Sequence, residues 1–238
     1  MRSSLLAILL ALIGGCDVAG SNTFGADAGI YAADSAGAEP TDHKQLTANC
    51  NVMTLYASEV VSFTPGTNAG YGQSEMPDIV LGPPLPGPSS KGALDVVSLG
   101  VGGEIILSFG DKQLVDGPGP DLVIWENVFW VGGNPENPFA ELGEVSLSND
   151  GEEWFTFPCE PGLNNEFDVG CAGWRPRVEF DPCTLVPLTP DATGGDAFDL
   201  AELGLSEARY VRIRDISESG ASPSAGFDLD AVGAIHLK

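Results

Sequence analysis

The stretch SAGFDLDAV, residues 224–232, places two aspartates in what is otherwise the last apolar strand of the chain. If residues 227–237 are extended, their side chains alternate between two faces, and one face carries Phe227, Leu229, Ala231, Ile235 and Leu237. Asp228 and Asp230 then share the other face with Val232 and Ala234. Two carboxylates at positions i and i+2 lie about 7 Å apart, close enough to repel each other or to share a cation. The stretch therefore predicts a largely buried strand whose charges need a partner.

Short apolar runs separated by Gly and Pro continue upstream of this strand, which is typical of an all-β domain. The run DLVIWEN is apolar on both faces over residues 122–125, so it predicts a central, buried strand. One helical turn is expected at 196–204, with Asp196 as its cap and Gly204 as its end. The expected strands are 54–63, 96–99, 103–109, 121–125, 142–148, 154–158, 210–215 and 227–237. Residues 50–238 are therefore predicted to form a jelly-roll β-sandwich.

The N-terminal stretch MRSSLLAILLALIGGC, residues 1–16, has the features of an export signal. Arg2 supplies a positive charge, and the apolar run that follows is too short to remain as a membrane-spanning helix. The run IGGC resembles the lipobox of bacterial lipoproteins, which implies cleavage after residue 15 and acylation of Cys16. The alternative is an ordinary secretory peptide that happens to contain a cysteine. Residues 16–49 lack apolar periodicity and are predicted to be a disordered tether.

The net charge of the chain is −24, from 34 Asp and Glu against 10 Lys and Arg. A charge of this sign disfavours nucleic acid and anionic membrane surfaces as partners. Any contact with a membrane is therefore expected through the acyl anchor alone. Solubility outside the cell explains the acidic composition, and binding of a multivalent cation is the narrower explanation.

Four cysteines remain once Cys16 is set aside, and an even number in an exported chain predicts two disulfides. Three pairings are possible. Cys159 and Cys171 enclose a short Gly- and Asn-containing segment, which suits a loop disulfide and leaves Cys50 to pair with Cys183. No two of these cysteines have the C-x-x-C spacing of zinc or redox sites.

Residues suited to catalysis are few. The two histidines lie in the tether (His43) and three residues from the C-terminus (His236), and no metalloprotease, nucleophile-elbow or phosphate-loop motif occurs. Paired carboxylates of a glycoside hydrolase are the remaining enzymatic alternative, because an acidic chain always contains such pairs. No catalytic residue is predicted.

The acidic residues gather at strand edges and in Gly-rich loops. With so few basic residues to neutralise them, buried carboxylates favour a structural calcium ion. The candidate ligands from this reasoning are Asp121, Asp199, Asp228 and Asp230. The alternative for each is a solvated loop or an aspartate that accepts backbone hydrogen bonds.

The tryptophans divide into core and surface candidates. Trp125 and Trp154 lie within strand patterns and are predicted to be core residues. Trp130, in the loop NVFWVGGNPENPF, and Trp174, near Cys171, are the candidates for stacking on a sugar ring.

Three segments, GEVSLSNDGEEWFTF, ARYVRIRD and GFDLDAVGAI, resemble the later part of discoidin and related galactose-binding-like sandwiches. A longer set of segments over residues 57–236 resembles a family of bacterial cell-surface lipoproteins. The resemblance implies a galactose-binding-like fold. It also implies that Asp230, on the closing strand, shares a structural calcium ion with an acid near the first strand, here Glu59.

These observations predict a non-catalytic, surface-anchored binding module in the bacterial envelope, at the outer membrane or cell surface, that recognises glycan. The alternative from another functional class is a structural or protein-interaction lipoprotein of the envelope. A hydrolase is the third alternative.

Overall fold

The computed structural model describes residues 53–84, 92–160, 170–181, 184 and 186–238. Contacts divide the chain into the units Met1–Ala38 and Glu39–Lys238, and every described residue belongs to the second unit. The predicted signal peptide, Cys16, the tether, Cys50 and Cys183 lie outside the described residues. Within these ranges, no helix is long and apolar enough to cross a membrane.

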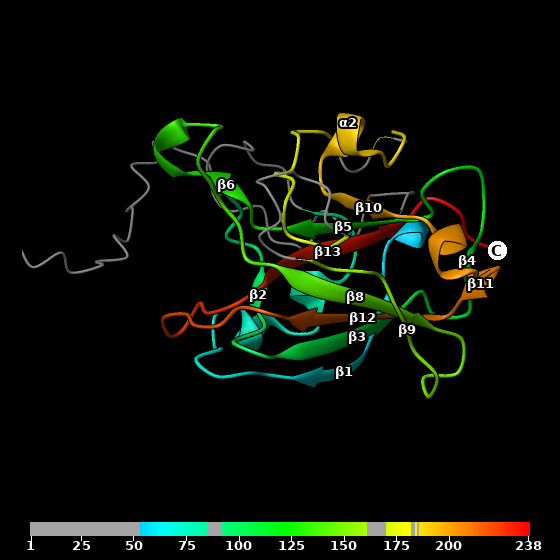
Figure 1. Cartoon of the computed structure of the whole chain (residues 1–238), viewed down its shortest axis with the longest axis horizontal. Helices are drawn as coiled ribbons and strands as arrows, with labels where there is room; N and C mark the ends of the chain where they lie inside the picture. Colours follow the sequence, from blue (N-terminus) through cyan, green and yellow to red (C-terminus); the bar gives the residue numbers. More distant parts are fainter. Residues whose placement is uncertain (1–52, 85–91, 161–169, 182–183, 185) are drawn as a thin grey trace, which may run out of the picture. The chain divides into compact units, whose positions relative to one another are not determined.

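Two antiparallel sheets form the body of the domain (Figure 1). The five-stranded sheet has the order β1 (Glu59–Thr64), β3 (Glu104–Ser108), β12 (Tyr210–Asp215), β8 (Gly143–Ser148) and β9 (Phe155–Thr156). The four-stranded sheet has the order β10 (Asp196–Phe198), β5 (Leu122–Glu126), β13 (Asp228–Ala234) and β2 (Val97–Ser98). Each of the eight strands expected from sequence overlaps a strand of these two sheets.

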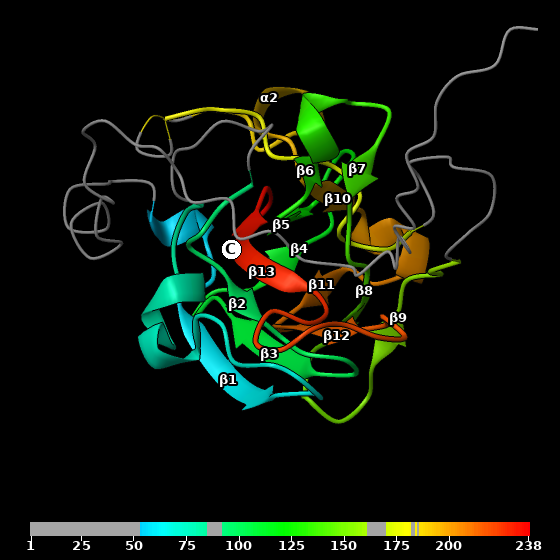
Figure 2. The same ribbon diagram turned by 90° about the vertical axis from the view of Figure 1, so that its left-hand side faces the viewer.

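The two sheets pack face to face, as the turned view in Figure 2 shows. Alternate residues of the strands point between them because side chains alternate along a strand. The core includes Ile105, Leu107, Val145, Leu147, Val211 and Ile213 from one sheet and Leu122, Ile124, Leu229 and Val232 from the other. Burying each such side chain stabilises the fold by roughly 1.5–3 kcal/mol. The predicted fold class, an all-β sandwich, is therefore confirmed.

A second apolar cluster covers the outer face of the four-stranded sheet. Trp125 lies at its centre, fully buried, and its indole N–H donates a hydrogen bond of 3.1 Å to the Thr193 carbonyl. Val123 and Ala231 contribute from the sheet, while Leu188 comes from the segment that precedes the short helix α2 (Pro190–Thr193). Strand β5 is therefore buried on both faces, as its continuous apolar run predicts.

Strand β13 departs from the predicted alternation. Its pairing with β5 shifts register between Leu229 and Ala231, so Asp230 lies at a β-bulge. Beyond the bulge, Val232 and Ala234 join Leu229 in the core between the sheets, whereas Ala231 turns to the outer cluster. The prediction that Val232 and Ala234 share a face with Asp228 is not confirmed, because the inserted residue reverses the faces.

The segment 196–204 also differs from expectation. Asp196 begins strand β10 and does not cap a helix. The 3-10 helix η5 (Leu200–Leu203) follows it, capped by Asp199, whose carboxylate accepts the Ala201 N–H, and ended by Gly204 in a left-handed conformation. The predicted turn therefore exists, but it begins three residues later because the first residues pair with β5.

Two short antiparallel ribbons are the other strand pairs among the described residues. One joins β4 (Leu114–Val115) to β11 (Glu207–Ala208), and the other joins β6 (Phe129–Trp130) to β7 (Pro138–Phe139). The 3-10 helix η4 (Val131–Gly133) follows β6 directly. The remaining 3-10 helices are η1 (Met53–Leu55), η2 (Gln73–Glu75) and η3 (Asp78–Val80).

Candidate functional site

The aspartate at the bulge of β13 has a basic partner. Arg177 Nη1 lies 3.2 Å from Asp230 Oδ2, and both side chains are buried, at 8% and 1% exposure. The scarcity of basic residues favoured calcium as the partner of Asp230, and the structure gives this carboxylate a basic side chain as a partner. Its expected companion, Glu59, lies on β1 in the other sheet, where it accepts a hydrogen bond of 2.8 Å from the Ser108 hydroxyl. Each of these two acids thus has its own protein partner.

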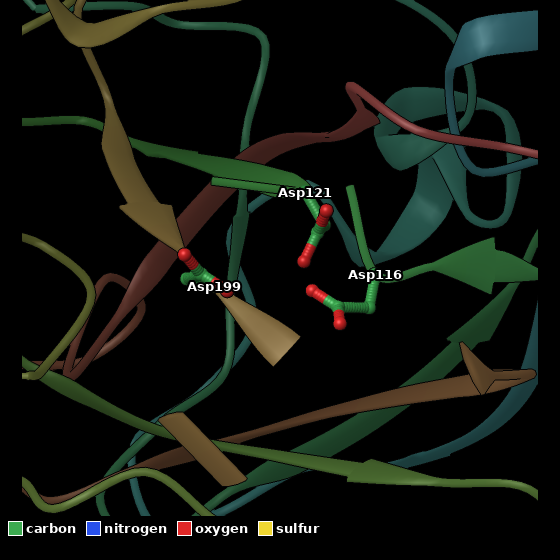
Figure 3. A group of neighbouring side chains, drawn as sticks. All are labelled: Asp116, Asp121 and Asp199. Atoms are coloured by element: carbon green, nitrogen blue, oxygen red, sulfur yellow. The ribbon is translucent and has the colours of Figure 1, made fainter. Parts of the chain in front are cut away.

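Three other acids, Asp116, Asp121 and Asp199, converge beside the start of β5 (Figure 3). We call them the Asp121 group. They offer carboxylate oxygens that lie within 4.8 Å of one another. The structure therefore brings together two of the predicted calcium ligands, Asp121 and Asp199, and adds Asp116 from the loop before β5.

Protein donors already occupy the buried member of the Asp121 group. Asp121 Oδ1 accepts the Gly117 N–H at 2.8 Å and lies 2.7 Å from His236 Nδ1, while Oδ2 accepts the Leu200 N–H at 2.8 Å. Both oxygens of this fully buried carboxylate are thus satisfied by the fold itself. The arrangement matches the alternative of an aspartate held by backbone hydrogen bonds.

A second acidic group lies at the opposite end of β5. Glu126 is the last residue of β5, Asp228 is the first residue of β13, and Glu141 follows β7 by two residues. We call these three the Glu126 group, and they also offer carboxylate oxygens within 4.8 Å of one another. Among the described residues, none of the three forms an ion pair with Lys, Arg or His.

Protein donors reach each carboxylate of the Glu126 group, and Asp228 accepts hydrogen bonds from two side chains, Ser98 and Asn127. Glu126 Oε1 accepts the Asp228 N–H at 3.4 Å, and Glu141 Oε1 accepts the Gly226 N–H at 3.0 Å. Asp228 Oδ1 accepts the hydroxyl of Ser98, its neighbour on β2. Glu126 Oε2 is buried and has no hydrogen-bond partner in the described part of the chain. This oxygen distinguishes the Glu126 group from the Asp121 group.

The electrostatics of the Glu126 group follow from burial and mutual repulsion. Burial raises the pKa of Glu126 well above its usual range, and the charges of Asp228 and Glu141 raise it further. Burial, followed by the charge of Asp228, raises the pKa of Glu141 to about 8. Burial raises the pKa of Asp228 to about 6, although hydrogen bonds from Ser98 and Asn127 oppose the change. Without a cation, the fold therefore resists full ionisation of this group.

A small cavity adjoins Glu126. Its lining includes Ala93, Asn127, Arg177 and Asp230, and it leaves about 10 Å³ for the centre of a water-sized sphere. That space suits about one water molecule or ion. A sugar ring is much larger than one water molecule and does not fit there. A glycan bound beside Glu126 would therefore lie on the surface.

The β6–β7 hairpin presents such a surface. The rings of Phe129 and Phe139 stack with centroids 5.0 Å apart and planes inclined by 19°. Phe139 and Val131 are 45% and 44% exposed, and residues 131–137 between the two strands are all exposed. Trp130 is half-buried beside them and pairs with Pro138 in the ribbon. The predicted ligand residue Trp130 thus belongs to an exposed aromatic hairpin that also displays Asn134 and Asn137.

The other predicted ligand residue, Trp174, lies in a separate segment. It is half-buried, and its backbone N–H donates to Asp196 Oδ2 at 2.9 Å. The Cys159–Cys171 disulfide is present upstream, as predicted, with a sequence separation of 12 residues. Trp174 is therefore placed by backbone contacts to β10 and is not part of the aromatic hairpin.

Glu126 and Glu141 were not among the metal ligands predicted from the sequence. The usable signal was position: Glu126 immediately precedes the aromatic loop, and Glu141 immediately follows it. Acids at both stems of one loop come together when the loop closes as a hairpin. Trp154, predicted as core, is partly exposed instead, with the Arg212 guanidinium 4.3 Å from its ring centroid.

Comparisons with known proteins found similar solved structures. No family model matches the chain, and no curated protein matches it. Among solved structures, it is similar to the CBM32 of AlyQ in complex with 4,5-unsaturated mannuronic acid, at 15% identity and a TM-score of 0.34, over 76% of this chain and 98% of that one. It is also similar to the C-terminal domain of a Bacteroides fragilis chitobiase, at 14% identity and a TM-score of 0.31, over 78% and 95% of the two chains.

A glycoside hydrolase shows the same level of similarity, at 12% identity and a TM-score of 0.31. The match covers 61% of this chain, which spans only 23% of the length of the hydrolase. At TM-scores below 0.5, none of these likenesses transfers a ligand or an activity. What is established is therefore an all-β sandwich with an aromatic hairpin and two acidic groups.

Proposed function

We propose that this chain is a non-catalytic glycan-binding module, exported and held on the bacterial envelope by acyl chains on Cys16. The observation that supports glycan binding is the exposed aromatic hairpin. Aromatic faces pack against the apolar faces of sugar rings, and amide side chains nearby can bond hydroxyls. The hairpin offers both kinds of group: its two strands carry Trp130 and Phe139, and the exposed Asn134 and Asn137 lie in the segment between the strands.

A neutral or weakly charged ligand suits the charge of the protein. With a net charge of −24, the chain repels polyanions at long range. A sugar is instead recognised through short-range stacking and hydrogen bonds, which this net charge does not oppose.

The same hairpin supports the alternative of a protein-interaction module. Val131 and Phe139 are large apolar side chains, each more than 40% exposed, and exposed apolar patches also mark protein interfaces. The proposed glycan ligand and this alternative predict different partners for one surface, so a single binding screen separates them.

The screen is a glycan array probed with the full chain carrying Cys16→Ser, which removes the proposed acylation site. We expect binding to a defined set of related glycans. If no glycan binds above background while an envelope protein is captured in a stoichiometric complex, the glycan proposal fails.

The anchor is tested separately in cells. The acyl chains are expected to supply essentially all membrane affinity for so acidic a chain, so Cys16→Ser should move the protein from the membrane fraction to the soluble fraction. A variant that stays membrane-bound after a high-salt wash contradicts the lipoprotein assignment.

A further inference from the structure

We propose that Glu126, Glu141 and Asp228 bind one divalent cation, calcium by its coordination chemistry, at the base of the β6–β7 hairpin. The inference concerns the acids alone and does not depend on what the hairpin recognises.

The first observation is the unpartnered oxygen of Glu126. The residue is only 3% exposed, and its Oε2 has no hydrogen-bond partner among the described residues. A buried carboxylate oxygen without a donor is costly, so native structures pair such atoms with protein, water or an ion. Asp215, another buried acid, by contrast accepts the N–H groups of Gly102 and Phe227 at 2.9 and 2.8 Å.

The second observation is the spacing of the three carboxylates. Their oxygens lie within 4.8 Å of one another. Two oxygens bound to one calcium ion at 2.3–2.6 Å can be at most about 5 Å apart, so the three acids are close enough for one ion to bind an oxygen of each. Calcium accepts flexible sets of carboxylate oxygens, whereas magnesium demands near-octahedral ligands and usually keeps several waters, so calcium is the expected ion. Glu126 Oε2 has no protein donor among the described residues, and the other two acids bring further carboxylate oxygens close to it.

The third observation is the local charge. Arg177 faces the cavity beside Glu126, but it is paired with Asp230 at 3.2 Å, so those two charges offset each other. Three carboxylates then remain together without a basic partner in the described residues. A divalent cation removes both their repulsion and the desolvation cost of their charges. The adjoining cavity has room for a water ligand.

The position of the ion has a mechanical consequence. Glu126 lies three residues before Phe129, and Glu141 lies two residues after Phe139. A cation shared by them ties together the two stems of the hairpin and joins both to β13 through Asp228. If the hairpin is the glycan surface, as proposed above, the ion pre-organises that surface.

The test measures calcium binding without any glycan, so its outcome is independent of the glycan proposal. The full chain carrying Cys16→Ser is melted in CaCl2, in MgCl2 and in chelator, and CaCl2 is titrated by calorimetry. The variants are Glu126→Gln and Glu141→Gln, with Asp116→Asn, in the Asp121 group, as the matched control. Glu141 is only partly buried, so its variant carries the test if Glu126→Gln does not fold.

At a calcium concentration one hundred times Kd, the melting temperature should rise by about 5–10 °C relative to chelator. The calorimetric stoichiometry should be one ion per chain, with calcium bound more tightly than magnesium. Both Gln variants should bind at least about tenfold more weakly, and Asp116→Asn should behave as the parent chain. Identical parent melts in calcium and chelator overturn the proposal. A rise in melting temperature with calcium that persists in both Gln variants but is lost in Asp116→Asn also overturns the proposal, because the ion then lies in the Asp121 group.

Discussion

The ion pair between Arg177 and Asp230 allows a quantitative prediction for Arg177→Met. The substitution keeps an unbranched side chain of similar length but removes the charge that faces Asp230, which is 1% exposed. Removing one partner of a buried pair typically costs about 3–5 kcal/mol, because the other charge stays buried and uncompensated. For a domain of this size, that corresponds to a fall in melting temperature of roughly 6–20 °C. Asp230→Asn should cost a similar amount, since it removes the negative charge that faces the buried Arg177.

The assay is urea denaturation of the parent, both single variants and the double variant, fitted with a common m-value. Because the two groups lie 3.2 Å apart, the double variant should lose at least about 2 kcal/mol less than the sum of the two single losses. Additive losses of stability, or losses below about 1 kcal/mol in the single variants, would refute the argument that Arg177 neutralises the charge of Asp230 at the bulge of β13. Asp230→Asn should also keep its stabilisation by calcium, since Asp230 is not part of the Glu126 group.

Three further predictions concern stability. In chelator, burial raises the pKa of Asp228 from its usual 3.8 to about 6. The contribution of this carboxyl to the free energy of unfolding is therefore fully present below about pH 4 and is lost as pH rises through 6. The loss is at most about 3 kcal/mol, and urea melts at pH 4.5 and 7.5 should show it. Replacing Cys159 and Cys171 by Ser removes a disulfide between residues 12 apart in sequence and should lower the free energy of unfolding by about 3 kcal/mol. Reduction of the parent chain should lower it by the same amount, which is the check. Gly143→Ala places a methyl group 2.8 Å from the Phe227 ring and should cost about 1–3 kcal/mol by calorimetric melting, and an unchanged melting temperature would contradict the tight packing.

The sandwich was predictable because the apolar pattern of its strands is local. The run over residues 122–125 is apolar on both faces, and β5 is indeed covered by the inter-sheet core on one side and the Trp125 cluster on the other. The short ribbons β4–β11 and β6–β7 were not among the predicted strands.

The bulge at Asp230 was not predictable from alternation. A bulge inserts one residue into a strand and reverses the faces beyond it, and only the pairing with β5 reveals it. The partner of Asp230 was equally hidden, because Arg177 lies 53 residues earlier in a segment without strand pattern.

The acids that lie close together in sequence fall into two separate groups because a strand runs between them. Asp121 and Glu126 stand in one acidic run, yet a strand advances about 3.3 Å per residue, so they lie at opposite ends of β5, roughly 17 Å apart. Asp199 reaches Asp121 because β10 pairs with β5, and Glu141 reaches Glu126 because the hairpin closes between them. Both approaches depend on long-range pairing that no local pattern encodes.

The most direct test of the proposed function is the affinity of Trp130→Ala for the best glycan found on the array, measured by calorimetry. Trp154→Ala is the matched control, because Trp154 is also a partly exposed tryptophan but lies beside β9 and stacks with Arg212. The account predicts that Trp130→Ala weakens binding by about tenfold or more, as for a central aromatic contact, with the melting temperature changed little, while Trp154→Ala binds as the parent does. Equal affinities for the parent and Trp130→Ala, or a loss in Trp154→Ala alone, would contradict the assignment of the aromatic hairpin as the glycan-binding surface.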